Sequence, residues 1–406
     1  MRRNWRGATV VLVGLGLLAS ACGGTGTGGG GGGAAKTVKL YSSLPLTGPS
    51  RAQTLTVVNG IKMAMDENGG TNGTGAKIGS ITVEYESLDD ATAAKQSWDA
   101  AQEAENGRKA AEDSKTVGYL GTFNSGAARI SIPVMNKAGI PMISPANTAT
   151  DLTLDKSKDS VYYASGKRNY FRVIPNDNIQ GLVGANWMAA LNVKKVFIVD
   201  DTDLYGKGLA DVFQSNAAKA GLTVVGREGA PKADNFNALV TKIKAAGAEG
   251  VYYGGIVDNN PAVLVKNLRA VDTKIVFMGA DGIQCDEMIK QMGSAGEGVY
   301  ATFGGVSVDK YTGIQADWLK KYKDKYKEDP QPYAIYGYEA ANVMLKAIKD
   351  ADGDRGKMID SVKKIGTNYD GVLGKWSFDA NGDTSNTAHT GVVVQGGKWV
   401  FSKVLN

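Results

Sequence analysis

Two hydroxyl side chains stand shortly after two short apolar segments: Ser125 follows residues 117–120, and Thr148 follows residues 142–144. Each lies where a strand would give way to a turn or a helix. In a parallel α/β sheet, the carboxyl ends of strands and the amino ends of helices meet at one edge, with unpaired backbone N–H groups pointing outward. The sequence therefore predicts that both hydroxyls lie at one sheet edge, in a pocket that holds a small carboxylate with neutral donors.

The surrounding pattern supplies the elements that would position these hydroxyls. From residue 38, short apolar strands at 38–41 and 81–86 alternate with helices near 55–67 and 91–113. A second alternating series follows Arg172, with strands near 196–199, 222–227, 250–253 and 274–278, and a final hairpin over 391–405 turns at Gly396 and Gly397. Because 406 residues exceed what one core usually organises, we predict two doubly wound α/β lobes.

The amino-terminal 36 residues predict export and anchoring. Residues 1–21 combine a basic start, an apolar run and small residues, which is typical of a signal peptide, and Cys22 directly after them fits a bacterial lipoprotein. An ordinary signal peptide and a twin-arginine signal are the alternatives. Residues 22–36 are glycine-rich and predict a flexible tether, so the lipid on Cys22 would attach the protein to the outer face of a membrane or to its periplasmic side.

Composition excludes several classes of function. The formal charge is +5, and removing the three arginines of the leader leaves a nearly neutral chain, which argues against a nucleic-acid partner. His389 is the only histidine, so histidine triads and histidine metal sites are excluded. Asp379, Asn381 and Asp383 are interpreted as a turn rather than a calcium loop, and Cys285 as a packed residue rather than a reactive thiol. We expect neither an enzyme nor a cofactor or metal.

Seven segments in order give the chain a family resemblance. Besides residues 121–153, they are SLPLTGP at 43–49, RVIPNDNIQG at 172–181, VDDTDLYGKGLA at 199–210, VYYGGI at 251–256, MGADGI at 278–283 and YAIYGYEAANVML at 333–345. Over nearly all of residues 37–406 the chain resembles the leucine/isoleucine/valine-binding proteins of ABC importers, which are type I periplasmic binding proteins. The resemblance implies two Rossmann-like lobes joined by a three-segment hinge, with lobe 1 formed by 37–173 plus 304–376 and lobe 2 by 174–303 plus 377–406.

The same resemblance implies roles for individual residues. Ser125 and Thr148, with the backbone of Ala146, would bind the carboxylate of an amino acid. Taken alone, each hydroxyl is better explained as a helix cap or a turn, and the match of the flanking segments reverses that preference. Asp281 would bind the ammonium group, with an ordinary Asp-Gly turn as the alternative, and Tyr205 would lie over the ligand.

Three further positions are predicted to contact the ligand or to set its selectivity. Gln53 and Ile256 stand where some relatives carry aromatic residues, which puts a leucine-type ligand in question, and Asn124 would tune selectivity. Asp258 and Asn259 could do the same, although solvated loop residues are the simpler interpretation.

Together these features predict an extracytoplasmic, lipid-anchored solute-binding protein that closes two lobes on a small, branched-chain or other apolar amino acid. Its partners would be an ABC permease with its ATPase subunits and the membrane reached through Cys22, and we presume a monomer. Two alternatives use the same fold. One is a different ligand, such as a short amide, urea or an aromatic acid, and the other is a ligand sensor rather than a transport component.

Overall fold

The computed structural model describes residues 36–405. The predicted signal peptide and the predicted lipid attachment at Cys22 lie outside the described residues. Strand β1 begins at Lys36, one residue inside the range predicted for the tether.

A six-stranded sheet organises the first half of the chain. Its order is β2 (Gly75–Ile78), β3 (Ile81–Asp89), β1 (Lys36–Leu44), β6 (Thr116–Gly121), β7 (Met142–Ser144) and β8 (Tyr170–Arg172). All neighbours are parallel except β2 and β3. Successive residues of β1, Leu40 and Tyr41, are both buried, because helices cover both faces of the sheet.

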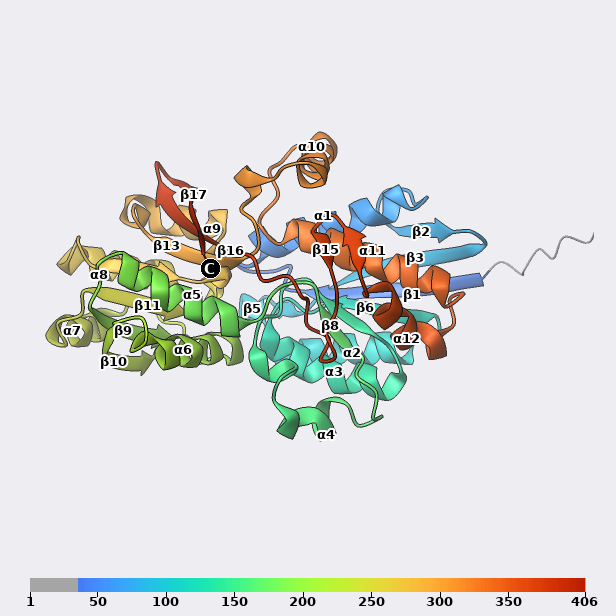
Figure 1. Ribbon diagram of the computed structural model, residues 1–406, viewed down its shortest axis with the longest axis horizontal. Helices are drawn as coiled ribbons and strands as arrows, with labels where there is room; N and C mark the ends of the chain where they lie inside the picture. The colour runs from blue at the N-terminus through green and yellow to red at the C-terminus, as the bar shows by residue number, and fades with distance from the viewer. Residues whose placement is uncertain (1–35, 406) are drawn as a thin grey trace, which may run out of the picture. The chain divides into compact units, whose positions relative to one another are not determined.

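Helices from distant parts of the chain cover this sheet. One face carries α1 (Arg51–Glu67), α11 (Ala334–Asp350) and α12 (Arg355–Ile365), and the other carries α2 (Ala100–Glu112) and α3 (Ser125–Ala138), as Figure 1 shows. A short helix, α4 (Asp159–Tyr162), lies beside α3. Helix α11 packs against α1, although more than 260 residues separate their starts.

A seven-stranded sheet organises the rest. Its order is β10 (Thr223–Gly229), β9 (Lys195–Asp200), β11 (Gly250–Gly254), β12 (Val276–Gly279), β13 (Tyr300–Gly304), β16 (His389–Gln395) and β17 (Lys398–Leu405). The first five strands are parallel, and β16 and β17 are antiparallel to their neighbours. Helices α5 (Asp177–Ala190) and α6 (Leu204–Ala217) cover one face, and α7 (Asn237–Ala245), α8 (Pro261–Val271) and α9 (Asp286–Met292) cover the other.

The final hairpin confirms the prediction from its glycines. Gln395 pairs with Lys398, so Gly396 and Gly397 alone form the turn, with φ of 59° and 70°. Two consecutive positive φ values suit a two-residue hairpin turn, and glycine adopts them without steric cost.

The chain passes between the two sheets three times. The crossings follow β8, β13 and β15 (Gly374–Trp376), and the second leads to α10 (Ile314–Tyr326). Strand β15 pairs with β14 (Tyr369–Gly371) in a separate two-stranded ribbon. The predicted class, two doubly wound α/β lobes joined by three segments, is therefore confirmed, while the predicted lobe boundaries stay predictions.

One predicted helix begins later than expected. Residues 91–98 form a small antiparallel ribbon of β4 (Ala91–Thr92) and β5 (Ser97–Trp98) instead of the first turns of a helix. Helix α2 starts at Ala100, because the Asp99 side chain accepts hydrogen bonds from the backbone N–H groups of Ala101 (2.9 Å) and Gln102 (3.1 Å). An aspartate cap of this kind stabilises a helix start at this position by pairing N–H groups that have no partner within the helix.

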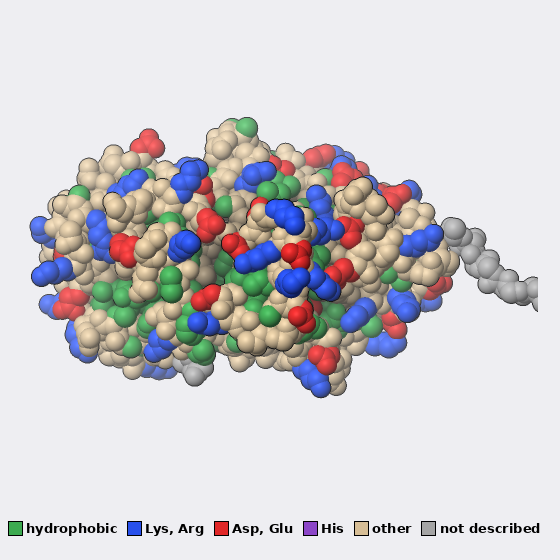
Figure 2. Space-filling model, turned by 90° about the horizontal axis from the view of Figure 1, so that it is seen from above, with side chains coloured by type: hydrophobic (Ala, Val, Ile, Leu, Met, Phe, Trp, Pro, Cys, Tyr) green, Lys and Arg blue, Asp and Glu red, His purple; other side chains and the backbone are tan. Residues whose placement is uncertain are grey.

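The surface agrees with the nearly neutral charge. Figure 2 shows Lys and Arg side chains intermingled with Asp and Glu on the face it presents. Within residues 36–405, every helix is too short or too polar to cross a membrane.

Candidate ligand-binding site

The first half of the site lies at the carboxyl ends of β6 and β7. These strands are parallel neighbours, with Tyr119 opposite Met142 and Leu120 opposite Ile143. The chain leaving β6 enters α3 at Ser125, and the chain leaving β7 forms the loop that carries Thr148. The prediction that the two hydroxyls lie at one sheet edge is therefore confirmed.

Hydrogen bonds hold these two segments against each other. The Ser144 hydroxyl donates to the carbonyl of Thr122 (2.8 Å) and accepts from the backbone N–H groups of Ala146 and Asn147 (3.1 and 2.8 Å). The Ser125 hydroxyl accepts from the backbone N–H of Ala149 (3.3 Å). These hydrogen bonds hold the two segments together as one unit rather than as two independent loops.

Two polar atoms of this edge lack partners. The Thr148 hydroxyl and the side-chain oxygen of Asn124 are buried and have no hydrogen-bond partner among residues 36–405. Buried polar atoms are normally paired, so an unpaired one needs a water or a ligand to satisfy it. Ser125 is the first residue of α3, where backbone N–H groups lack partners within the helix. This edge is therefore equipped to bind a polar group of a ligand.

The second half of the site comes from the seven-stranded sheet. Tyr205 is the second residue of α6, Ile256 follows β11, and Asp281 follows β12. The Tyr205 hydroxyl donates to Oδ1 of Asp281 (2.7 Å), while its oxygen accepts from the backbone N–H of Gly282 (3.4 Å). A carboxylate and an aromatic ring thus face the first edge.

Tyr333 completes the surroundings of Asp281 and was missed by the sequence reasoning. It immediately precedes α11, and its hydroxyl donates to Oδ2 of Asp281. Its ring packs edge-to-face against Phe123, with centroids 5.2 Å apart. Because α11 covers the six-stranded sheet, this hydrogen bond links the two halves of the molecule directly across the site.

A small cavity lies between the two halves. Its lining includes seven of the eight predicted residues, namely Asn124, Ser125, Ala146, Thr148, Tyr205, Ile256 and Asp281, together with Phe123, Gly282 and Tyr333. The space open to the centre of a water molecule is about 20 Å³, which suits about one water. A ligand larger than water therefore fits only after the halves move apart.

Gln53 is the predicted residue that does not line the cavity. It is fully buried on α1, and its amide nitrogen donates to the backbone carbonyls of Asp281 (3.2 Å) and Gln284 (3.3 Å). Gln53 thus holds the loop that carries Asp281.

The side chains that line the cavity include an acid but no base. Its lining contains Asp281 and no Lys, Arg or His. Burial raises the pKa of Asp281 above its ordinary value, and the hydrogen bonds from Tyr333 and Tyr205 oppose that rise. Such a carboxylate favours a cationic group that restores the solvation it has lost.

A second buried acid, Asp177, lies behind Thr148. Its backbone N–H donates to the carbonyl of Thr148 (2.9 Å), and within the described chain neither carboxylate oxygen has a partner. Burial, and after it the charge of Asp281, raises the pKa of Asp177 well above its ordinary value, while the nearby Thr148 hydroxyl, although outside hydrogen-bond geometry, opposes that rise. Asp177 opens α5, where an acid looks like an ordinary helix-start residue, so its burial beside Thr148 could not be predicted from sequence.

Asp258 differs from its sequence-based interpretation. The simpler interpretation predicts a solvated loop residue, and this is wrong, because Asp258 is fully buried. Its carboxylate accepts from the backbone N–H and the hydroxyl of Ser50 (2.7 and 2.8 Å) and from the Ser97 hydroxyl (3.1 Å). Since both serines belong to the first half of the molecule, Asp258 fastens the halves together next to the cavity.

The sequence also raises the questions of a reactive thiol and of a metal site. Cys285 is fully buried, and burial raises the pKa of its thiol to about 12, which fits the packed residue predicted. Among residues 36–405, no cluster of His, Cys, Asp and Glu is arranged to hold a metal ion.

Comparisons with known proteins agree with this architecture. Leu/Ile/Val-binding protein homolog 2 of Brucella abortus is 30% identical over 347 residues, which are 84% of this chain and 86% of that protein. The leucine binding protein LivK of Thermotoga maritima is 24% identical, with a TM-score of 0.79 over 91% of this chain and 99% of that one. A solute-binding protein of R. palustris in complex with benzoate is 19% identical, with a TM-score of 0.74 over 92% of this chain and 96% of that one.

The two likenesses to solved structures concern the fold, while the family follows from the sequence. A model of the periplasmic binding protein family matches residues 37–398. The resemblance identified from seven segments is therefore confirmed. The chain belongs to the periplasmic binding protein family, whose members bind solutes outside the cytoplasm and are not enzymes.

Proposed function

We propose that the protein binds a small, apolar α-amino acid in the cavity between its two halves, as the binding component of an ABC importer. The observation that carries this proposal is the opposition of Asp281 to the neutral donors around Ser125 and Thr148. An α-amino acid presents an ammonium and a carboxylate on one carbon, and this cavity offers an acceptor and donors at matching opposite walls. The Leu/Ile/Val-binding relative supports the same ligand class.

The ammonium group binds at Asp281 in this proposal. The Asp281 carboxylate already accepts hydrogen bonds from two tyrosine hydroxyls. A charge-assisted hydrogen bond from an ammonium is worth about 1.5–3 kcal/mol. Amine-free acids such as benzoate therefore suit this cavity poorly, although a solved relative of the fold carries benzoate.

The carboxylate binds at the other wall. The Thr148 hydroxyl lacks a partner, and the first residues of α3 offer backbone N–H groups. Neutral donors at a helix start hold an anion without a lysine or arginine. Ile256, Ala146 and Phe123 supply apolar walls of limited size, which favours a small or branched aliphatic side chain.

Binding proceeds by hinge closure in this proposal. The cavity is too small for an amino acid to enter, and Asp258, Gln53 and Tyr333 each link the two halves around it. The ligand enters when these links open, and the closed form is the one offered to a permease. A ligand stabilises closure only through contacts it makes better in the closed form, so the residues of the seven-stranded half must carry that gain.

Anchoring completes the proposal. Cys22 carries a lipid, and residues 22–35 tether the binding unit to the membrane. Fractionation of cells tests this point: Cys22→Ser should move the protein from the membrane to the soluble fraction. Unchanged membrane association in that variant would refute the lipid anchor.

The decisive test is calorimetric titration with matched ligands. L-leucine is compared with 4-methylpentanoate, which lacks the amine, and with 3-methylbutylamine, which lacks the carboxylate. We expect binding of L-leucine, L-isoleucine or L-valine and a loss of at least about tenfold for each truncated analogue, the equivalent of about 1.4 kcal/mol per missing group. Binding of the amine-free acid as tightly as the amino acid would refute the role of Asp281.

The same titration separates the alternative ligands. Urea, a short amide and benzoate serve as probes of the other chemistries. Heat from one of these, without heat from any amino acid, would replace the proposed ligand class while leaving the family and the binding cavity in place. An experiment with a permease distinguishes an importer component from a sensor. Reconstituted uptake of the ligand by a permease would support a role in import. Binding of the ligand without any uptake would support a sensor.

A further inference from the structure

A buried ion pair lies just outside the cavity, and neither the family assignment nor the proposed ligand accounts for it. Arg172 is the last residue of β8 and is fully buried, and its Nε lies 2.5 Å from Oδ1 of Asp383. Asp383 belongs to the crossing between β15 and β16. The pair therefore joins the end of β8, where the first connection between the sheets begins, to the third connection.

The remaining donors of Arg172 go to the loop that carries Thr148. Nη1 donates to the backbone carbonyls of Asn147 (3.2 Å) and Ala149 (2.8 Å), the two residues on either side of Thr148. Nη2 donates to the hydroxyl of Thr153 (2.5 Å) at the far end of the same loop. One guanidinium thus fixes both flanks of a cavity residue.

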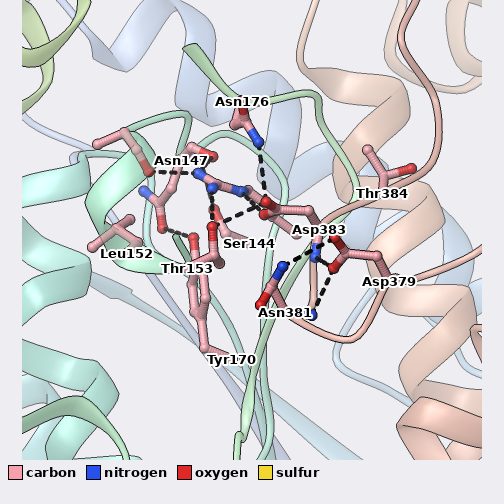
Figure 3. Close-up of polar contacts among 12 residues, drawn as sticks. Ser144, Asn147, Leu152, Thr153, Tyr170, Asn176, Asp379, Asn381, Asp383 and Thr384 are labelled. Atoms are coloured by element: carbon pink, nitrogen blue, oxygen red, sulfur yellow. Dashed lines mark hydrogen bonds and ion pairs between the residues drawn. The ribbon is translucent and has the colours of Figure 1, made fainter. Parts of the chain in front are cut away.

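Asp383 receives support from the same parts of the fold. Its Oδ2 accepts from the Thr153 hydroxyl and from the side-chain amide of Asn176, each at 3.0 Å. Figure 3 shows Asn176 and Thr153 directed at Asp383 from separate segments. Asn176 also caps α5 by accepting from the backbone N–H of Asn178 (3.1 Å).

The turn that presents Asp383 is itself rigid. The Asp379 carboxylate accepts from the backbone N–H groups of Asn381 (2.8 Å) and Asp383 (2.9 Å). This confirms the turn predicted for these residues. The backbone N–H of Arg172 also donates to the carbonyl of Gly382 (2.9 Å), so the turn is bound to β8 through its backbone as well.

A role in overall stability alone does not explain these contacts. A buried ion pair adds little net stability compared with well-packed apolar residues, because removing both charges from water offsets their attraction. Here Nη1 of the guanidinium satisfies two loop carbonyls that lie outside any strand or helix. Nε and Nη2 reach Asp383 and Thr153 at the same time, and the compact ammonium of a lysine cannot offer donors spread in this way.

We propose that Arg172 and Asp383 are a positioning pair that holds the Thr148 loop in its binding geometry and fixes that loop to the hinge connections. This inference rests on the proposed function, because the loop matters as a wall of the ligand cavity. When the halves separate, the loop stays with the six-stranded sheet and keeps its shape, so the ligand meets a preformed carboxylate site. Pre-organisation of this kind reduces the conformational cost of binding.

Hydrogen exchange measured by mass spectrometry on the ligand-free full chain tests the pair. In Asp383→Asn and in Arg172→Lys, the backbone N–H groups of residues 146–153 should exchange at least about tenfold faster, while those of β1 and β6 keep their rates. The control is Asp200→Asn, which breaks the Arg227 pair (2.9 Å) in the other sheet and should leave residues 146–153 unchanged.

Two outcomes overturn the proposal. One is unchanged exchange of residues 146–153 in both variants, and the other is faster exchange that rises equally in β1 and β6, which is the mark of a general loss of stability. If either charge variant fails to fold, Thr153→Val removes the bridging hydroxyl at nearly constant volume and should loosen the same residues to a smaller extent. The hydrogen-exchange experiment uses no ligand, so its result can be interpreted even if the amino-acid titration shows no binding.

Discussion

Replacing Asp281 by asparagine should weaken amino-acid binding without lowering the stability of the unliganded protein. The two effects have different origins. The ammonium loses a charge-assisted hydrogen bond worth about 1.5–3 kcal/mol, which corresponds to an increase in Kd of about ten- to 150-fold. The unliganded fold loses a buried carboxylate whose pKa is raised by burial, so replacing it with a neutral amide also removes a desolvation cost.

The geometry around Asp281 explains why asparagine should be tolerated. The amide oxygen still accepts from the Tyr205 hydroxyl, and the amide nitrogen donates to the Tyr333 oxygen in place of the present hydrogen bond. Removing the charge also removes its repulsion of Asp177. The melting temperature of the unliganded variant should therefore equal or exceed that of the natural protein.

The assay combines calorimetric titration of L-leucine, L-isoleucine and L-valine with thermal melting of the unliganded protein. Asp272→Asn is the matched control, because it removes an exposed acid from the same half of the molecule and should change neither quantity. An unchanged Kd in Asp281→Asn would refute its role as the ammonium anchor. A smaller increase in Kd than expected, together with a lower melting temperature of the unliganded variant, would show instead that Asp281 acts through the stability of the fold.

Three further predictions use the same structure. Asp258→Asn weakens the bonds from Ser50 that hold the halves together, so small-angle scattering of the unliganded protein should show a larger radius of gyration; an unchanged radius would contradict this role. Tyr333→Phe removes one hydroxyl from Asp281 and should lower the free energy of unfolding by about 1.5–3 kcal/mol in denaturant titration, whereas no change would mean that water replaces it. Burial raises the pKa of Glu103 from 4.5 to about 7, so the folded state holds its proton more tightly than the unfolded state does and stability falls as the pH rises through that range; melting followed against pH should show this fall, and Glu103→Gln should flatten it.

The first wall of the cavity could be predicted from sequence because it is local. Ser125 and Thr148 belong to consecutive strand-to-helix units, and parallel neighbours bring their carboxyl ends together by geometry alone. Asp281 and Tyr205 needed the family resemblance, since an Asp-Gly pair and a tyrosine in a helix have ordinary structural explanations. Their mutual hydrogen bond depends on how α6 and β12 sit on the second sheet, which periodicity does not specify.

The remaining residues of the site escaped prediction for physical reasons. Tyr333 reaches the cavity because α11 returns to pack on α1, a long-range contact without a local signal. Asp177 and Asp258 look like loop or helix-start acids in the sequence, and their burial appears only when the two halves meet. Residues 91–98 favour a helix by composition, yet the Asp99 cap places its start at Ala100.

The contacts already present without ligand define what a ligand has to achieve. Asp258 fastens the halves outside the cavity, whereas the Tyr333 hydroxyl links them inside it by using one oxygen of Asp281. A ligand that displaces Tyr333 from Asp281 therefore breaks a closing contact and must replace it with a stronger one. An ammonium does so, because it adds the attraction between two opposite full charges to the hydrogen bond, while a neutral donor merely exchanges one hydroxyl contact for another. Since a ligand shifts closure only by its differential affinity, a neutral isostere of the bound amino acid should occupy the cavity weakly and leave the closing equilibrium unchanged.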